Sequence, residues 1–113
     1  YKQWIPNKYD MHTVSLPTLA KVSTYLKARK ATRNKHDKSW DRLVFNDFAV
    51  KGEWLEAAMK ITGSSEIYVK SSVTALLIEG NGYTMVLMPI KNTEVDKDTG
   101  ETKHMPITNF DNI

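Results

Sequence analysis

Residues 48–91 read FAVKGEWLEAAMKITGSSEIYVKSSVTALLIEGNGYTMVLMPIK and are rich in apolar side chains. In their first part, apolar residues recur at steps of three and four, a spacing that predicts an amphipathic helix over residues 52–62. The predicted apolar face carries Trp54, Leu55, Ala58, Met59 and Ile61, and the opposite face carries Glu53, Glu56 and Lys60. Gly63 follows directly, and a glycine in the left-handed conformation commonly ends a helix.

Three consecutive strands are predicted after this helix. Residues 65–70 alternate, with Ile67 and Val69 on one face. Residues 73–79 are apolar on both faces, so both faces of this strand should be covered. The sequence Gly-Asn-Gly at 80–82 predicts a tight hairpin turn, because Asn-Gly tolerates the positive φ values of a primed turn. The last predicted strand covers residues 83–90. Pro89 should terminate its pairing, because proline has no amide hydrogen to donate to a neighbouring strand.

The flanking regions give weaker patterns. Upstream we expect a strand over 11–15, a helix over 17–30 with Ser15 as its N-cap, a mobile loop over 30–40 and one strand over 42–50 with Leu43 and Phe45 on one face. The expected buried stripe of the first helix is Leu16, Leu19, Ala20, Ser23 and Leu26. Downstream, the turn signal at 96–100 predicts a hairpin, and residues 108–113 are expected to form a loose tail. The predicted organisation is a linker-like segment over 1–8, one domain over 9–91, and a hairpin with tail over 92–113.

Composition limits the class of protein. With 113 residues, 41% hydrophobic and 26% charged, the chain is long enough for one domain with a core. It has no apolar run long enough to span a membrane, and its absence of cysteine is compatible with the cytoplasm. The chain starts at Tyr1 rather than Met, which is compatible with a piece of a longer protein. The net charge is +3, but residues 27–42 alone carry seven positive and two negative side chains, a local balance of +5.

Catalysis has little support in the sequence. His12, His36 and His104 are far apart and lack a second ligand at metal-binding spacing. Glu53 and Glu56 lie three residues apart, but solvated helix carboxylates are far commoner than general acid–base pairs. We therefore expect a protein that is not an enzyme, with no cofactor and no metal, and with no association with a membrane.

Residues 48–91 resemble the end of the bacterial DNA sliding clamp, the beta subunit of DNA polymerase III. The resemblance is carried by Leu55-Glu56-Ala57 in the helix, by the strand VTALLIE at 73–79, and by the closing Met88-Pro89-Ile90-Lys91. It implies an α+β fold with two helices packed on an antiparallel sheet, in the manner of a reduced processivity-fold domain. It also implies a DNA replication module that binds partners rather than a catalyst.

The resemblance further implies a groove for short peptides of the type Gln-Leu-x-Leu-Phe, carried by DNA polymerase and other replication proteins. Position by position, the groove residues would be Val73, Ala75, Val86, Met88, Pro89 and Ile90, with Trp54 in place of an aromatic residue that the family has near Glu53. Met suits such a groove because it is flexible and polarizable. The implied contacts to duplex DNA, independent of its sequence, fall on Lys27, Arg29, Lys30, Arg33 and Lys35.

The chain also departs from the family pattern. About two strands are missing before the 42–50 region, and residues 92–113 continue beyond the usual end. A ring in the family needs six such domains. The chain is therefore compatible with a homo-oligomer, a fragment, a reduced relative from a mobile element or phage, or a peptide-binding decoy. Two other functions stay open: a small basic nucleic-acid-binding protein that uses residues 27–42, and an interaction or inhibitor protein that pairs a sheet edge through the hairpin at 92–108.

Overall fold

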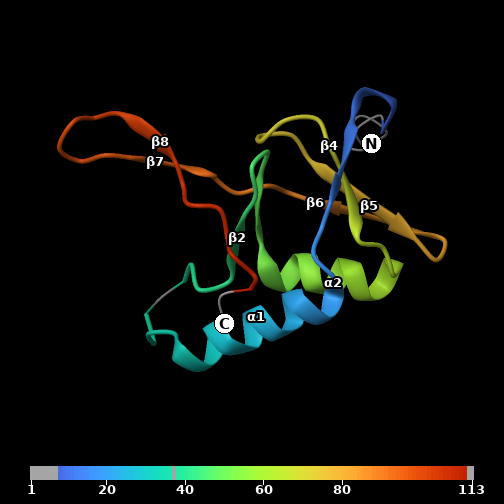
Figure 1. Ribbon diagram of the computed structural model, residues 1–113. Helices are drawn as coiled ribbons and strands as arrows, with labels where there is room; N and C mark the ends of the chain where they lie inside the picture. Colours follow the sequence, from blue (N-terminus) through green and yellow to red (C-terminus); the bar gives the residue numbers. More distant parts are fainter. Residues whose placement is uncertain (1–7, 37, 112–113) are drawn as a thin grey trace.

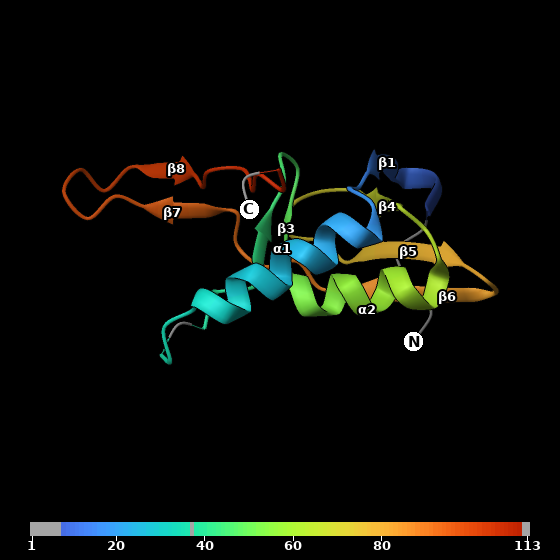
Figure 2. The ribbon, with the colours of Figure 1, turned by 60° about the horizontal axis from the view of Figure 1, so that its bottom comes forward.

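The computed structural model describes residues 8–36 and 38–111. After a short 3-10 helix, η1 (Lys8–Asp10), the chain forms a four-stranded antiparallel sheet of order β1-β4-β5-β6. Its strands are β1 (His12–Ser15), β4 (Glu66–Val69), β5 (Leu76–Gly80) and β6 (Tyr83–Leu87). The helices α1 (Leu19–Thr32) and α2 (Gly52–Thr62) lie side by side on one face of this sheet (Figures 1 and 2). The predicted α+β class, with two helices on an antiparallel sheet, is confirmed.

Helix α2 has the bounds that its periodicity predicts. Leu55, Ala58 and Met59 are buried against the sheet, and the helix ends at Gly63, whose φ of 67° is left-handed and whose N–H donates to the Met59 carbonyl. The prediction is wrong for Trp54 and Ile61, which are 51% and 41% exposed. Both lie on the flank of α2 that turns away from the sheet, because successive helix residues are rotated by about 100°.

Helix α1 starts later than the sequence suggests. Ser15 is not its N-cap, because Ser15 still pairs with Glu66 in the sheet and the Leu16 N–H donates to the Ser65 carbonyl. Thr18 caps the helix instead, and its Oγ1 accepts a hydrogen bond from Lys21 N at 3.3 Å. The predicted stripe is also partly wrong. Val22 and Leu26 are the buried residues of α1, whereas Ala20 is exposed.

Residues 42–50 form two strands rather than the single strand that we expected. β2 (Arg42–Val44) and β3 (Ala49–Lys51) pair antiparallel around a turn at Asn46 and Asp47. The apolar residues on both sides of that turn are all buried. The sequence here therefore does not alternate between apolar and polar residues, which is the pattern that identifies a half-exposed strand. The Ile90 N–H donates to the Ala49 carbonyl at 2.8 Å and connects this hairpin to the end of the main sheet.

The C-terminal segment has two parts. β7 (Thr93–Val95) and β8 (Thr102–His104) form the predicted hairpin, which extends away from the helices and the main sheet (Figure 1). The predicted loose tail is wrong over its described part. Thr108 exchanges two hydrogen bonds with Val44 of β2, and the Phe110 ring packs against Tyr25 with centroids 5.2 Å apart. The predicted linker over 1–8 lies almost wholly outside the described residues, as do the last two residues of the predicted tail.

The core lies between the helices and the inner face of the main sheet, where Ile67, Val69, Leu76 and Ile78 are fully buried. The hairpin β2–β3 closes one end of this core with Leu43 and with Phe48, whose ring stacks on Phe45 at 4.8 Å. In the described residues, no helix is both long enough and apolar enough to cross a membrane.

Candidate functional site: an apolar hollow and a basic helix end

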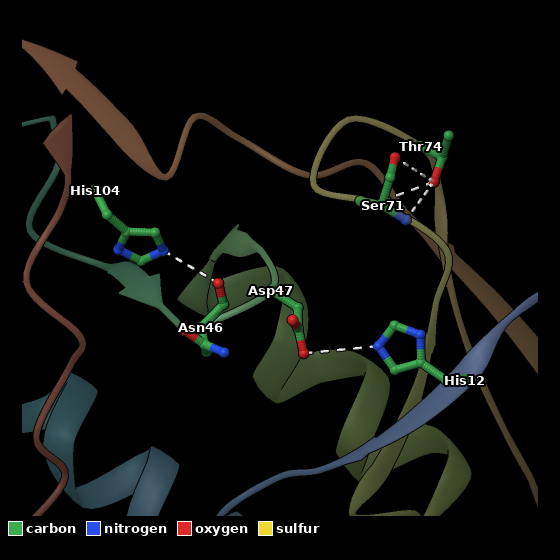
Figure 3. A network of polar contacts seen from close by, with 6 residues as sticks. All are labelled: His12, Asn46, Asp47, Ser71, Thr74 and His104. Carbon is green, nitrogen blue, oxygen red and sulfur yellow. Dashed lines mark hydrogen bonds and ion pairs between the residues drawn. The ribbon is translucent and has the colours of Figure 1, made fainter. Parts of the chain in front are cut away.

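Three of the seven groove residues implied by the resemblance line one hollow of about 700 Å³. Val73, Pro89 and Ile90 form one wall, and Val95 and Thr102 of the β7–β8 hairpin lie among the other lining residues. Val73 is 80% exposed because it lies in the turn before β5. That turn is fixed by Thr74, whose Oγ1 accepts hydrogen bonds from the amide and the hydroxyl of Ser71, both at 3.2 Å (Figure 3).

Two further groove residues lie on the sheet face that the helices leave uncovered. Val86 pairs with Leu77, and its neighbours Met85 and Leu87 point to the core, so Val86 faces the opposite side and is 42% exposed. Met88 follows Val86 at a step of two and is 55% exposed. Val86 and Met88 are therefore surface residues, although core positions are the commonest use of such an apolar strand.

The remaining two groove residues are less closely associated with the hollow. Ala75 is half-buried just before β5. Trp54 lies in the first turn of α2, with the Lys51 ammonium 5.8 Å from the centre of its ring. Among the described residues, neither side chain lines the 700 Å³ hollow.

The five residues implied in DNA contact are all exposed and lie at one end of α1 or just beyond it. The following loop is tied back to the helix. Arg29 Nε donates to the Trp40 carbonyl at 3.2 Å, and the Arg33 guanidinium lies 5.1 Å from the centre of the Trp40 ring. Trp40 itself is buried. Two of the five positive side chains at this end of α1, Arg29 and Arg33, are thus held against Trp40.

Asp41, an acidic residue of the basic stretch, is buried at the start of α2 rather than exposed among the positive side chains. It is only 2% exposed, its Oδ2 accepts a hydrogen bond from the Glu53 amide at 3.3 Å, and its carbonyl accepts one from Gly52 at 2.6 Å. These contacts satisfy amides in the first turn of α2, where a carboxylate also stabilises the helix dipole. Asp41 therefore has a structural role at the N-terminus of α2.

Two histidines serve as ties between elements. His12 of β1 forms an ion pair with Asp47 at 3.6 Å, and His104 of β8 places Nε2 3.1 Å from the Asn46 carbonyl (Figure 3). The turn between β2 and β3 is thus contacted by a histidine from each of the other two sheets. His36 lies in the turn after α1, where its amide donates to Asn34. In the part of the chain that the structure describes, no three His, Cys, Asp or Glu residues are grouped to hold a metal.

Sequence reasoning missed a second hollow, of about 620 Å³, on the other side of the C-terminal segment. It is lined by Arg29 and Arg42 and by the segment from Met105 to Asn109. No local pattern could have found it, because its walls come from α1, β2 and a stretch that reads as an unstructured tail.

Comparison with models of protein families, with curated proteins and with solved structures found no match to this chain.

Proposed function

We propose that this chain is a non-enzymatic binding module of the processivity type, which holds replication proteins such as a DNA polymerase by a short apolar peptide. The peptide lies along Val73, Val86, Met88 and Ile90 and enters the hollow beside the β7–β8 hairpin. A module of this kind works in the cytoplasm and needs no cofactor. It acts with other copies or other domains, since one such domain is too small to encircle DNA.

The observation that carries the proposal is the exposure of large apolar side chains beside a concave surface. Val73 and Met88 are 80% and 55% exposed, and Pro89 and Ile90, which follow Met88, line the adjoining hollow of about 700 Å³. Exposed apolar groups next to a concavity are typical of sites that bind another chain. The side chains involved are the ones that the resemblance to the sliding clamp implies.

The peptide that fits this surface is extended and has apolar side chains at alternating or nearby positions. Leu and Phe side chains gain free energy when they leave water for an apolar site. Met88 adapts to their shapes because its side chain is unbranched and polarizable. A peptide of the type Gln-Leu-x-Leu-Phe meets both requirements.

A fluorescence-polarisation titration with a labelled Gln-Leu-x-Leu-Phe peptide tests the proposal. We expect saturable binding, weakened about tenfold by Met88→Ala, because truncation of a well-packed side chain in an interface costs about 1–2 kcal/mol. The matched control is Ile107→Ala, since Ile107 is 56% exposed against 55% for Met88 and lies outside the groove. Absence of saturable binding, or equal weakening by both substitutions, contradicts the proposal.

A second candidate function, nucleic-acid binding by the basic end of α1, is favoured by the five exposed positive side chains that lie there. If this is the main function, the isolated chain binds linear duplex DNA strongly and with a steep dependence on salt, and Lys30→Gln and Lys35→Gln each reduce that dependence. Weak binding of duplex by the isolated chain is expected if the peptide groove is the main site.

A further inference from the structure

We propose that the hollow of about 620 Å³ between α1, β2 and the C-terminal segment is a binding site for a phosphate group, held by Arg29 and Arg42. This site is separate from the peptide groove and does not depend on it. The ligand is recognised as a tetrahedral oxoanion, either a phosphodiester of a nucleic-acid backbone or a phosphate monoester such as that of a nucleotide.

Among the described residues, Arg42 has only weak or neutral hydrogen-bond partners. Its Nε is buried and has no hydrogen-bond partner among the described residues, and its Nη1 has only the Met105 sulfur at 3.5 Å. Nη2 donates to the neutral hydroxyl of Ser39 at 3.2 Å. Thioethers are weak acceptors, and a guanidinium is normally matched by an anion when it is taken partly out of water. Among the described residues, no carboxylate forms an ion pair with Arg42.

Arg29 places a second guanidinium on the same hollow. Its Nε donates to the Trp40 carbonyl, which fixes the plane of the group and leaves the two terminal nitrogens available. None of the ion pairs formed by the described residues includes Arg29 or Arg42. Two guanidinium groups facing one concavity are suited to an oxoanion, because each fork can bond two oxygens.

The rest of the lining is mixed in character. Ser39 and Thr108 supply hydroxyl groups, and Glu94 is the one carboxylate among the lining residues. The Thr108 wall is held in place by the hydrogen bonds between Val44 N and Thr108 Oγ1 at 2.8 Å and between Thr108 N and the Val44 carbonyl at 2.9 Å. The exposed positive charges of Lys30 and Lys35 lie close by in the chain and attract anions toward this end of the molecule.

The test is an NMR titration of the full chain with inorganic phosphate, followed through the arginine Nε–H signals and matched in ionic strength by chloride. We expect saturable shifts at Arg29 and Arg42 in phosphate but not in chloride. Arg42→Gln and Arg29→Gln should each weaken binding about tenfold, the effect of losing one charge-assisted contact. The control Arg33→Gln, which changes an exposed arginine outside the hollow, should change the affinity less than twofold.

Two further arms identify the source of the phosphate. A short single-stranded oligonucleotide without terminal phosphates that moves the same signals more strongly than inorganic phosphate identifies a nucleic-acid backbone. A nucleoside monophosphate that does so identifies a phosphate monoester. If Arg42→Gln does not fold, as judged by dispersion of its amide signals, Arg29→Gln alone carries the test. Equal shifts in phosphate and chloride, or an equal loss with Arg33→Gln, overturn the proposal.

Discussion

The body of the protein, residues 12–90, and its C-terminal segment, residues 92–111, are stabilised in different ways. In the body, side chains such as Phe48, Leu55 and Ile78 are completely buried. In the C-terminal segment β8 is exposed throughout and Val95 is 63% exposed. The segment is held to the body by hydrogen bonds, such as that from Thr108 N to the Val44 carbonyl at 2.9 Å, and by the Phe110 ring.

This difference explains where the candidate sites lie. A sealed core offers no surface for a ligand, whereas a segment that projects from the body at its hairpin and packs back onto it at Thr108 leaves spaces along its sides. The hollow of about 700 Å³ has apolar residues of the body on one wall, and the hollow of about 620 Å³ has two arginines. Glu94 of β7 lines both. The C-terminal segment thus forms part of the wall of two sites with opposite chemical character.

The largest effect on stability should come from the body. Phe48→Ala removes a fully buried ring stacked on Phe45 and should lower the free energy of unfolding by about 3–5 kcal/mol. Val95→Ala in the hairpin should change it by less than about 0.5 kcal/mol, because Val95 is already exposed. Urea unfolding of both variants measures the contrast. Similar losses for the two would show that the segment is packed as firmly as the body.

A backbone contact in the body gives the next largest effect. A Cβ added at Gly80 would lie 2.0 Å from the Thr62 carbonyl oxygen, where β5 ends against α2. Gly80→Ala should therefore cost about 1–3 kcal/mol of stability as the helix end shifts. Gly100→Ala in the hairpin meets no atom within 4 Å and carries only the strain of a positive φ. In Gly100→Ala, changes in the NMR amide signals should be confined to the hairpin. Changes that extend to α2 would contradict this expectation.

The attachment of the C-terminal segment to β2 can be weakened at one residue. Thr108→Val removes the hydroxyl that accepts the hydrogen bond from the Val44 amide and should cost about 1 kcal/mol. Hydrogen exchange at Val44 should become faster in this variant. Thr102→Val, on exposed β8, is the matched control and should leave Val44 protected. Unchanged exchange in Thr108→Val would mean that the contact does not hold the segment.

The smallest effect concerns pH and the hairpin turn. The hydrogen bond from the Asp98 amide holds the pKa of Asp96 below its ordinary value of 3.8, with a smaller contribution from Lys103. Because the pKa of Asp96 is lower in the folded protein, its ionised carboxylate stabilises the turn above pH 3.8. This stabilisation is lost as the pH falls through the folded pKa. NMR signals of the turn should change in that acidic range while those of the body do not. Asp96→Asn should abolish the transition, and its persistence would assign it to another group.

The same difference explains what the sequence could predict. Helix α2 and the Asn81–Gly82 turn follow from strict periodicity and from residues with special φ values, here 53° and 79°. The β2–β3 hairpin was missed because all of its apolar residues are buried, so no alternation marked its strands. The attachment of Thr108 and Phe110 depends on partners more than sixty residues away, which local patterns do not contain.

The candidate sites, too, could be predicted from the sequence only in part. Val73, Pro89 and Ile90 were identified through the resemblance, while other residues of their hollow belong to a hairpin for which the resemblance has no counterpart. Arg42 was counted only as part of a charged stretch. That its Nε is buried without a hydrogen-bond partner among the described residues is a property of the tertiary structure alone.

The most direct test of the peptide groove is a methyl-NMR titration of the labelled chain with a Gln-Leu-x-Leu-Phe peptide. The proposal predicts saturable shifts at Val73, Val86, Met88 and Ile90, and at Val95 across the hollow, with Val22 and Val50 in the core unchanged. Shifts that are absent, or that centre on α1 instead of these residues, would contradict it.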